Sequence, residues 1–512
     1  MKNKLTKNIY RVLLVASFLA INGLIIAGIS AVLSYLNTGA DKASILHLEE
    51  PMEKVYAPKV VWGNLDNPGR PMEKQTLQEI ERDYLNAWHV RNIALKDNDV
   101  YGISDFYTDS ARIRIFEHID LNIKNKIFFK ETTLSHYPEL DFYSEDGTLV
   151  VFTDKNVERY QETYNKDSLL LHKKDTTNYQ IMMLLEDGFW RIRHLQELEI
   201  EQNGIQNKER NLDSVLASIT KVKGLNYYPK NTPWDTFGKK FNESIINKDF
   251  EIIKGMGLNT IRVFVQYDDF GKADVPSEKL KRLKSLLDLA ENNDLKAMVT
   301  LFDFYGDYDI TNWTLTQRHA ETIVNSLKDH PALLGWDVKN EPDLDFDSRG
   351  KNRVLSWLKE MTTKMKQWDP NHHVTIGWSS PEAAIHLAEE VDFVSYHYYR
   401  EPEHFLEAHN TLKSVVKNKQ IVLQEYGYSS YDGFWNLYLG SEEEQVDYYK
   451  TMQKQLAENN VPFLFWTLYD FEEVPNAVAG SLPWRTRKQH YFGCFDYKGS
   501  KKKVFDVLNQ SP

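Results

Sequence analysis

Two glutamates stand at the ends of short hydrophobic runs that resemble strands. Glu341 lies in WDVKNEPD (336–343), and Glu425 lies in LQEYG (423–427). Two carboxylates in one site can divide a reaction between them, because one protonates a leaving oxygen while the other attacks carbon. Cleavage of a glycosidic bond needs this division of work. The two glutamates can provide it only if the fold brings their strands to one place.

Eight strand-like runs alternate with helical runs from residue 222 onward, and this alternation predicts a parallel sheet. Helical patterns such as 277–293 and 441–460 separate the strands. Eight repeats over about 290 residues predict a (β/α)₈ TIM barrel, an α/β fold. The alternative is an open doubly wound sheet, but its first turn is usually rich in glycine. Here that turn reads Asn226-Tyr227-Tyr228-Pro229. The predicted strands are 222–227, 259–265, 296–302, 333–338, 373–377, 391–397, 420–425 and 462–467.

Polar and aromatic side chains gather at the carboxyl ends of these predicted strands, where TIM barrels carry their active sites. The fourth and seventh strands end at the two glutamates, so both are expected at one mouth of the barrel. The residues expected around them, in chain order, are Arg262, Asn340, His397, Tyr399 and Trp466.

Four segments together resemble the clan A glycoside hydrolases, especially the cellulase and mannanase relatives in glycoside hydrolase family 5. HPALLGWDVKNEPD (330–343) is similar to the group's fourth-strand motif, and QEYG (424–427) to its nucleophile strand. His397 and Tyr399 match a sixth-strand His-x-Tyr pattern, and YFGCFDYKGSKKKVFDVL (491–508) is similar to the terminal strand, turn and helix. The resemblance covers about residues 222–512 and implies a retaining glycosidase acting on O-glycosyl bonds.

The resemblance also implies a role for each matching residue. Glu425 needs nearby cationic and hydroxyl donors to stay charged, whereas Glu341 needs a raised pKa to hold its proton. The implied roles are acid/base for Glu341, nucleophile for Glu425, binding of the sugar 2-hydroxyl for Asn340, orientation and ionisation of Glu425 for Arg262 and Tyr399, contact with the acid or the substrate for His397, and the floor under the reacting sugar for Trp466.

The third predicted strand departs from the family pattern. Many cellulases of the family carry a histidine near this strand end, but here the stretch reads TLFDFYGDYD (300–309), which includes Asp303. This favours mannanase-like or unusual relatives over ordinary cellulases. No histidine pair has the helical spacing of metal ligands, so we expect no catalytic metal and no cofactor.

The N-terminal residues 1–36 predict a short cytoplasmic tail and a transmembrane helix. Val12–Ala40 carries no charged side chain, and a bilayer core needs about 20 helical residues. Lysine and arginine precede this run and acidic residues follow it, which places the rest of the chain outside the cytoplasm. We therefore expect a single-pass protein of the cell membrane. A secreted protein with a cleaved signal peptide is the alternative.

Two regions separate this anchor from the barrel, which is expected at 215–512. Residues 37–74 contain scattered proline and charge without a sustained period and predict a linker. Residues 75–200 begin with a helical pattern and continue with strands, including a hairpin that turns at Glu186-Asp187-Gly188. This α+β pattern resembles a cone-like nuclear transport factor 2-like domain. Such domains often enclose a pocket or mediate dimerisation, so we name dimerisation through 75–200 as an option.

The amino-acid composition limits the classes of molecule that the protein is expected to bind. The formal net charge of −12 argues against nucleic acid, because phosphate binding needs a basic surface. An oligo- or polysaccharide is the expected substrate, a β-linked glycan of glucan or mannan type. Two alternatives stay open: a membrane-anchored transglycosylase of envelope or exopolysaccharide metabolism, and a non-catalytic glycan-binding scaffold.

Overall fold

A computed structural model describes residues 54–198, 217–437, 439–480 and 482–509, together with residues 17, 18, 21, 22 and 25. The predicted tail and anchor at 1–36 and the first part of the predicted linker lie outside the described residues, apart from those five positions. Among the helices that the structure describes, none is both long and apolar enough to cross a bilayer.

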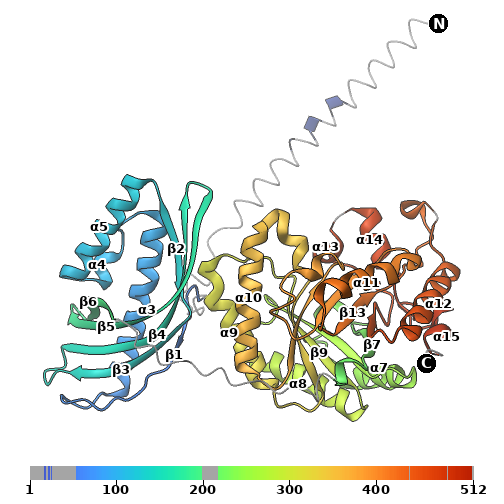
Figure 1. The fold of residues 1–512 in the computed structure, drawn as a ribbon, viewed down its shortest axis with the longest axis horizontal. Helices are drawn as coiled ribbons and strands as arrows, with labels where there is room; N and C mark the ends of the chain where they lie inside the picture. The colour runs from blue at the N-terminus through green and yellow to red at the C-terminus, as the bar shows by residue number, and fades with distance from the viewer. Residues whose placement is uncertain are drawn as a thin grey trace, which may run out of the picture. The chain divides into compact units, whose positions relative to one another are not determined.

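Residues 59–198 form an α+β unit, called the sheet domain below. Its strands pair in the order β1-β3-β4-β5-β6, and β2 pairs with β4. Helices α3 to α5 lie against one face of this sheet (Figure 1). The elements are β1 (Lys59–Val60), α3 (Lys74–Asp97), α4 (Ile103–Phe106), α5 (Asp109–Asn125), β2 (Phe128–Thr133), β3 (Ser135–Tyr143), β4 (Leu149–Asn165), β5 (Ser168–Glu186) and β6 (Phe189–Leu198).

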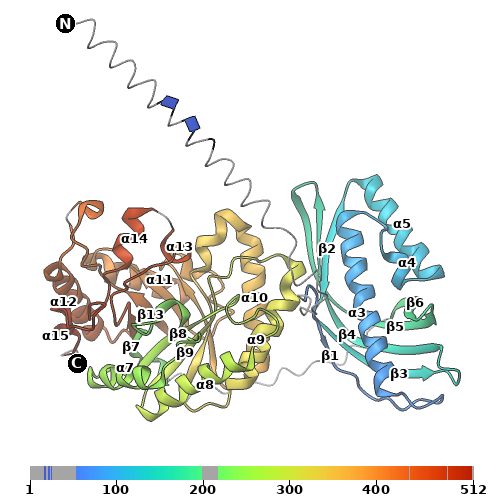
Figure 2. The ribbon, with the colours of Figure 1, turned by 180° about the vertical axis from the view of Figure 1, so that it is seen from behind.

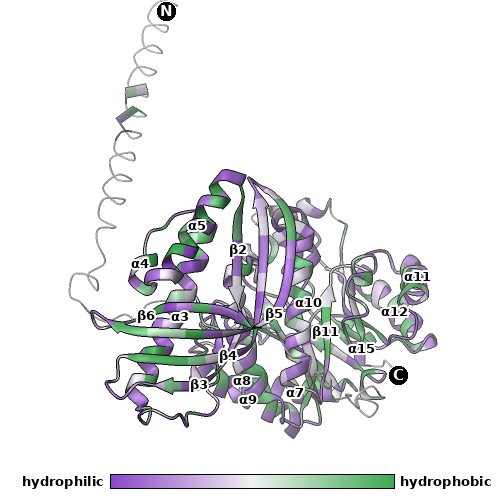
Figure 3. Ribbon diagram, turned by 60° about the vertical axis from the view of Figure 1, so that its left-hand side comes forward, coloured by the Kyte–Doolittle hydropathy of each residue, from purple (hydrophilic) through white to green (hydrophobic). Residues whose placement is uncertain are grey.

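Sequence periodicity explains the main elements of the sheet domain. Helix α3 buries Ile80, Tyr84 and Trp88, which recur at helical spacing on one face. Green and purple residues are interspersed along α3 and α5, as expected of amphipathic helices (Figure 3). The predicted hairpin joins β5 to β6, and Asp187 and Gly188 both have positive φ, at 53° and 85°. Two positive φ angles fit a tight turn between twisted strands.

Part of the predicted linker belongs to the sheet domain. Strand β1 pairs in parallel with β3, and Tyr56, Trp62, Leu65 and Met72 pack against the domain's hydrophobic core. A strand of two residues has too few positions for a recognisable period, so the sequence pattern did not predict it. The resemblance to nuclear transport factor 2-like domains stays a prediction.

A polar network of buried side chains and the half-buried Tyr56 links β2, β3, β4 and α3, and we call it the sheet-domain network. His136 Nε2 lies 2.8 Å from Thr133 Oγ1, and His136 Nδ1 lies 2.6 Å from Asp154 Oδ2. Tyr84 donates its hydroxyl hydrogen to the same Asp154 oxygen at 2.6 Å, and Tyr56 hydrogen-bonds Thr133. Burial in a medium of low polarity favours such mutual satisfaction of donors and acceptors.

The second part of the chain forms the predicted barrel. Eight parallel strands close in the order β10-β11-β12-β13-β14-β7-β8-β9, and helices surround them (Figures 1 and 2). The strands are β7 (Lys223–Asn226), β8 (Thr260–Gln266), β9 (Lys296–Asp303), β10 (Leu333–Asn340), β11 (His373–Trp378), β12 (Val394–Tyr398), β13 (Ile421–Tyr426) and β14 (Phe463–Phe465). The helices are α7 (Glu243–Gly255), α8 (Ser277–Asn292), α9 (Trp313–Leu327), α10 (Lys351–Trp368), α11 (Phe405–Val416), α12 (Glu442–Glu458), α13 (Asn476–Ala479), α14 (Pro483–Gln489) and α15 (Val504–Asn509).

The barrel interior changes from apolar to polar along its axis. Near the amino ends of the strands, Val222, Met298, Val422 and Leu464 belong to one buried apolar cluster. Toward the carboxyl ends, the buried interior is polar and includes Arg262, Thr300, Asp337, Thr375, Ser395 and Gln424. A buried polar layer costs stability unless its groups are paired. Its presence below the carboxyl ends of the strands indicates a function at that end.

Helices α9 and α10 of the barrel contact strands of the sheet domain. Tyr160 of β4 donates a hydrogen bond to Glu360 of α10, and its ring lies 4.9 Å from that of Trp313. Lys130 of β2 pairs with Asp309, which precedes α9. These contacts bury part of the sheet domain within the same chain. Dimerisation through residues 75–200 stays a prediction.

Candidate active site

The carboxyl ends of the eight parallel strands form one mouth of the barrel. Strand β10 ends at Asn340, Glu341 follows it, β12 carries His397, and β13 carries Glu425. Glu341 has a left-handed backbone conformation with φ of 47°. Such strain in a non-glycine residue costs about 1–3 kcal/mol and is concentrated at functional sites.

The two glutamates face one another across His397. A carboxylate oxygen of Glu341, a ring nitrogen of His397 and a carboxylate oxygen of Glu425 lie within 4.8 Å of one another. His397 Nδ1 lies 2.9 Å from Glu341 Oε1 and 3.9 Å from Glu425 Oε1. The Glu341 side chain is 26% exposed, whereas that of Glu425 is 9% exposed. Glu341 is therefore the carboxylate more open to solvent.

Glu425 has the donors that the sequence predicted. Arg262 Nη1 donates to Glu425 Oε2 at 3.2 Å, and the Tyr399 hydroxyl donates to Oε1 at 2.5 Å. Charge-assisted hydrogen bonds of this kind are about twice as strong as neutral ones. They also fix the direction of both oxygens, so Glu425 is held in one orientation at the mouth.

Arg262 is the centre of a wider network. Its guanidinium is fully buried and donates to Asp337 Oδ2 at 2.6 Å from Nη2, to Asn340 Oδ1 at 2.8 Å and to Asn226 Oδ1 at 3.0 Å. A buried cation is tolerated only when its donors are paired. Arg262 thereby joins the strand that carries Asn340 to the strand that carries Glu425.

The pKa order of the two glutamates differs from the expected one. Burial acts to raise the pKa of Glu341, but the hydrogen bond and charge of His397 outweigh it and hold that pKa below its usual value. Burial raises the pKa of Glu425, and the charge of Glu341 adds to this, while His397 and Arg262 oppose it. The expectation of a raised pKa at Glu341 is wrong for this arrangement, because His397 hydrogen-bonds Glu341 rather than Glu425.

Trp466 lies in an aromatic wall beside the carboxylates. It is 7% exposed and clusters with Tyr228, Phe264, Phe471 and Phe492. The Phe492 ring contacts that of Tyr399 at 5.8 Å, and the Arg262 guanidinium lies 4.5 Å from the centre of the Phe264 ring. The structure thus brings all seven sequence-predicted residues to one mouth. Their individual roles stay predictions.

Sequence reasoning missed several residues that support the site. Asp337 accepts from Arg262 and from the backbone of Gly377, and Asn226 also binds Arg262. A Cβ on Gly377 would lie 2.4 Å from Gln424 Oε1 and 2.9 Å from Arg262 Nη2, so glycine is needed there. One signal was available: a charged residue inside a hydrophobic strand run, as Asp337 is, requires a buried cation as partner.

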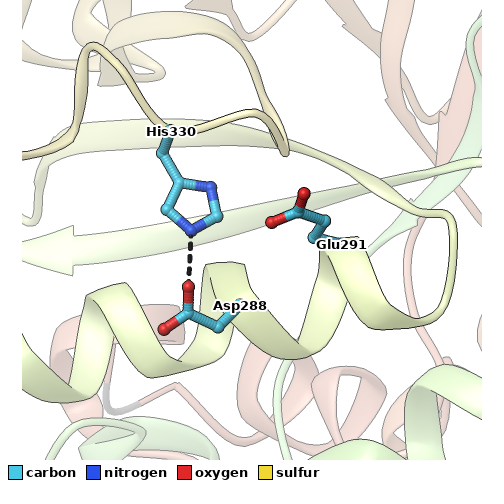
Figure 4. Close-up of side chains that lie close together, drawn as sticks. All are labelled: Asp288, Glu291 and His330. Carbon is cyan, nitrogen blue, oxygen red and sulfur yellow. Dashed lines mark hydrogen bonds and ion pairs between the residues drawn. The ribbon is translucent and has the colours of Figure 1, made fainter.

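A second group of titratable side chains lies on the outer layer of the barrel. Asp288 and Glu291 of α8 face His330, and His330 Nε2 lies 2.9 Å from Asp288 Oδ1 (Figure 4). His330 Nδ1 accepts the backbone N–H of Ala332, so Nε2 carries the hydrogen that it donates to Asp288. These hydrogen bonds connect α8 to the segment before β10, which gives the group a structural role.

A family model and several known proteins match parts of this chain. Residues 220–472 match the family model described as "Cellulase (glycosyl hydrolase family 5)". The β-glucuronidase of Chlorocebus aethiops is 25% identical over 272 residues, which covers 49% of this chain and 39% of the relative. A putative mannan endo-1,4-β-mannosidase 4 of Arabidopsis thaliana is 25% identical over 223 residues, 35% of this chain and 51% of the relative. The chain thus spans about half the length of these curated relatives or less.

Solved structures to which this chain is similar include an exo-β-1,4-mannosidase from Opitutaceae bacterium strain TAV5. It is 18% identical, with a TM-score of 0.46, and the match covers 56% of this chain and 58% of that one. A family 5 mannosidase from Rhizomucor miehei is 16% identical, with a TM-score of 0.44, over 57% of this chain and 92% of that one.

Proposed function

Residues 220–472 form a domain like those of the clan A glycoside hydrolases in family 5, and from this premise we propose that the protein is a retaining glycoside hydrolase. It cleaves a β-linked glycan by double displacement, with Glu425 as nucleophile and Glu341 as acid and then base.

The separation of the two carboxylates carries this proposal. An oxygen of Glu341 and an oxygen of Glu425 lie within 4.8 Å of each other. Retaining enzymes hold their carboxyl groups about 5–5.5 Å apart, whereas inverting enzymes need about 6.5–9.5 Å to admit a water molecule. The short separation favours direct attack by one carboxylate on the sugar.

In the first step, a Glu425 oxygen bonds to the anomeric carbon as the bond to the leaving oxygen breaks. Glu341 gives its proton to that leaving oxygen, and a glycosyl ester of Glu425 forms. Arg262 and Tyr399 oppose the rise that burial causes in the pKa of Glu425, and their hydrogen bonds aim its carboxylate before attack. A glycosidic oxygen that accepts the Glu341 proton competes with the His397 contact, so substrate binding favours the protonated acid.

In the second step, water attacks the anomeric carbon and the ester bond to Glu425 breaks. Glu341 takes the proton of that water. While Glu425 is an ester it carries no charge, and the repulsion that its charge exerts on Glu341 is absent. The pKa of Glu341 is then lower than in the free enzyme, which suits its change from acid to base.

The proposed substrate is a β-linked glucan or mannan. Two considerations support this class: several relatives are named mannan endo-1,4-β-mannosidases, and the aromatic wall around Trp466 offers ring faces for apolar contact with sugars.

We place the catalytic domain outside the cytoplasmic membrane, held by the N-terminal segment. The charge-free run Val12–Ala40 and its basic amino-terminal flank support this proposal. A phosphatase reporter fused after residue 54 tests it. Activity of the reporter is expected only when the fusion point lies outside the cytoplasm.

The mechanism is tested by the configuration of the first product. Proton NMR of a β-glycan digest, recorded before mutarotation, is expected to show the β-anomer first. An initial α-anomer would show inversion and contradict double displacement. The Glu425→Gln protein, prepared in the same way, is the control that links the product to this site.

A further inference from the structure

Asp303 is the last residue of strand β9, and its carboxylate contacts a tyrosine at the barrel mouth. The β8–β9 pairing shifts register between Phe264 and Gln266, which places Asp303 opposite Gln266. Asp303 Oδ2 lies 3.5 Å from the hydroxyl of Tyr228, which follows β7. Because β8 lies between β7 and β9, this contact reaches across the end of β8 inside the mouth.

The Asp303 carboxylate is buried with little hydrogen bonding. It is 2% exposed, and the 3.5 Å contact with Tyr228 is the one hydrogen bond it makes in the described part of the chain. An ionised carboxylate offers about four acceptor positions. Asp337 in the same mouth accepts from three groups, and Asp249 on α7 accepts from the hydroxyls of Tyr227 and Tyr469 at 2.7 and 2.6 Å.

A hydrogen-bond donor without a partner among the described residues, the buried Trp466 Nε1, belongs to a ring that packs 5.3 Å from the ring of the same tyrosine, Tyr228. We call the part of the mouth lined by Tyr228, Asp303 and Trp466 the corner. Burial raises the pKa of Asp303 to about 7, against the opposing charges of Lys339 and Arg262. Buried polar atoms are normally paired. An unpaired donor and an under-paired acceptor in one corner therefore fit a ligand that both donates and accepts.

We propose that Asp303 and Tyr228, with Trp466 Nε1 beside them, form a binding site for hydroxyl groups of the sugar that reacts with Glu425. The inference rests on the proposed function, because that function defines the sugar. Asp303 accepts a hydrogen bond from one hydroxyl, and Trp466 Nε1 donates to the oxygen of the same or a neighbouring hydroxyl. The rings of Tyr228 and Phe264, stacked 4.9 Å apart, close the corner with an apolar wall.

This site makes Asp303 a determinant of sugar specificity. A protein site built to bond a hydroxyl strongly disfavours an analogue that lacks it, because the site's own polar atoms are then buried unpaired. A merely structural acid that held Tyr228 in place would instead weaken every sugar to the same degree.

The test compares enzyme variants with substrate analogues. Asp303→Ala, Asp303→Asn and wild type are assayed on p-nitrophenyl β-D-glucoside and β-D-mannoside and on their 3-, 4- and 6-monodeoxy analogues. Wild type is expected to lose about 10-fold or more in kcat/KM for one deoxy position. Asp303→Ala is expected to lose as much with the parent sugar, and nothing further when that same hydroxyl is removed. If the loss in kcat/KM from Asp303→Ala and the loss from deoxygenation multiply at every position of the sugar, the inference is wrong.

Asp249→Asn is the matched control, because Asp249 is also buried but lies on α7 and accepts close hydrogen bonds from two hydroxyl groups. It is expected to keep the wild-type sensitivity to every deoxy position. Equilibrium binding of the same glycosides to the Glu341→Gln background, with and without Asp303→Ala, separates the two proposals. If wild type turns over the glycosides but the loss from Asp303→Ala is independent of the loss from removing any hydroxyl, the hydroxyl site is refuted and the proposed function is not. If the losses in affinity from Asp303→Ala and from removing one hydroxyl are coupled, but wild type does not turn over any glycoside, the proposed function is refuted and the hydroxyl site is not. Absence of binding by every glycoside refutes the hydroxyl site.

Discussion

The sheet domain and the barrel mouth each contain a buried histidine beside a carboxylate, but the two networks differ in exposure and pairing. His136 and Asp154 of the sheet-domain network are fully buried, and both ring nitrogens of His136 have partners. At the mouth, Glu341 is partly exposed, and His397 Nε2 has no partner among the described residues. Residue type alone therefore does not identify a reactive site; access and unpaired polar atoms do.

The largest expected difference between the two regions is the effect on kcat of replacing the proposed acid, Glu341. Glu341→Ala should lower kcat by about 10²–10⁴-fold on unactivated glycans, because a general acid contributes that much. The loss should be much smaller on a dinitrophenyl glycoside, whose leaving group needs no proton. Added azide should accelerate the variant by attacking the glycosyl ester without a base.

Equal losses on both substrates, with no effect of azide, would remove Glu341 from the acid/base role. Asp343→Asn is a suitable control near the same strand end, because Asp343 is engaged by Ser379. It should show no response to azide.

The second prediction concerns pH and His397. His397 holds the pKa of Glu341 below its usual value. Replacing His397 with asparagine removes that cation, so the pKa of Glu341 rises and the acid keeps its proton to higher pH. The basic limb of kcat/KM against pH should therefore move upward in His397→Asn.

His409→Asn is the matched control for this pH profile. His409 is also buried in the barrel, but burial lowers its pKa to about 4, and its Nδ1 contacts the Tyr396 hydroxyl. The control should leave the basic limb in place. If the limb is equally unmoved in His397→Asn, another group sets it.

The smallest effect on catalysis is expected from the sheet-domain network. Asp154→Ala leaves the Tyr84 hydroxyl, His136 and the Tyr137 N–H without their acceptor. The free energy of unfolding should fall by about 3 kcal/mol, since each unsatisfied buried group costs about 1–3 kcal/mol. Thermal unfolding measures this loss, and kcat per folded molecule should stay unchanged. A tenfold fall in kcat at full folding would break the contrast between the two regions.

The sequence was sufficient for the barrel and for the residues at its strand ends. Strand periodicity located Glu341 and Glu425, and parallel pairing dictated that they meet at one mouth. The pattern could not decide which carboxylate His397 bonds, because that depends on sub-ångström placement of three side chains. It also overlooked β1, whose two residues have no period, and Asp337, whose buried partner Arg262 lies 75 positions away in the chain.

The sequence predicted the position of Asp303 in the fold but not its contacts. Its place at a strand end was visible in TLFDFYGDYD, but its orientation was not. A register shift in the β8–β9 pairing places it opposite Gln266, and residue periodicity does not predict such a shift.

Glu425 is the residue proposed to attack the sugar. Wild-type protein treated with a 2-deoxy-2-fluoro-β-glycosyl fluoride, in the gluco and manno forms, and digested for mass spectrometry tests it most directly. We expect one covalent glycosyl adduct, on the peptide that contains Glu425. It should be absent from the Glu425→Gln protein and should still form in Glu341→Gln. An adduct on another residue, or one that persists in Glu425→Gln, would contradict this role of Glu425.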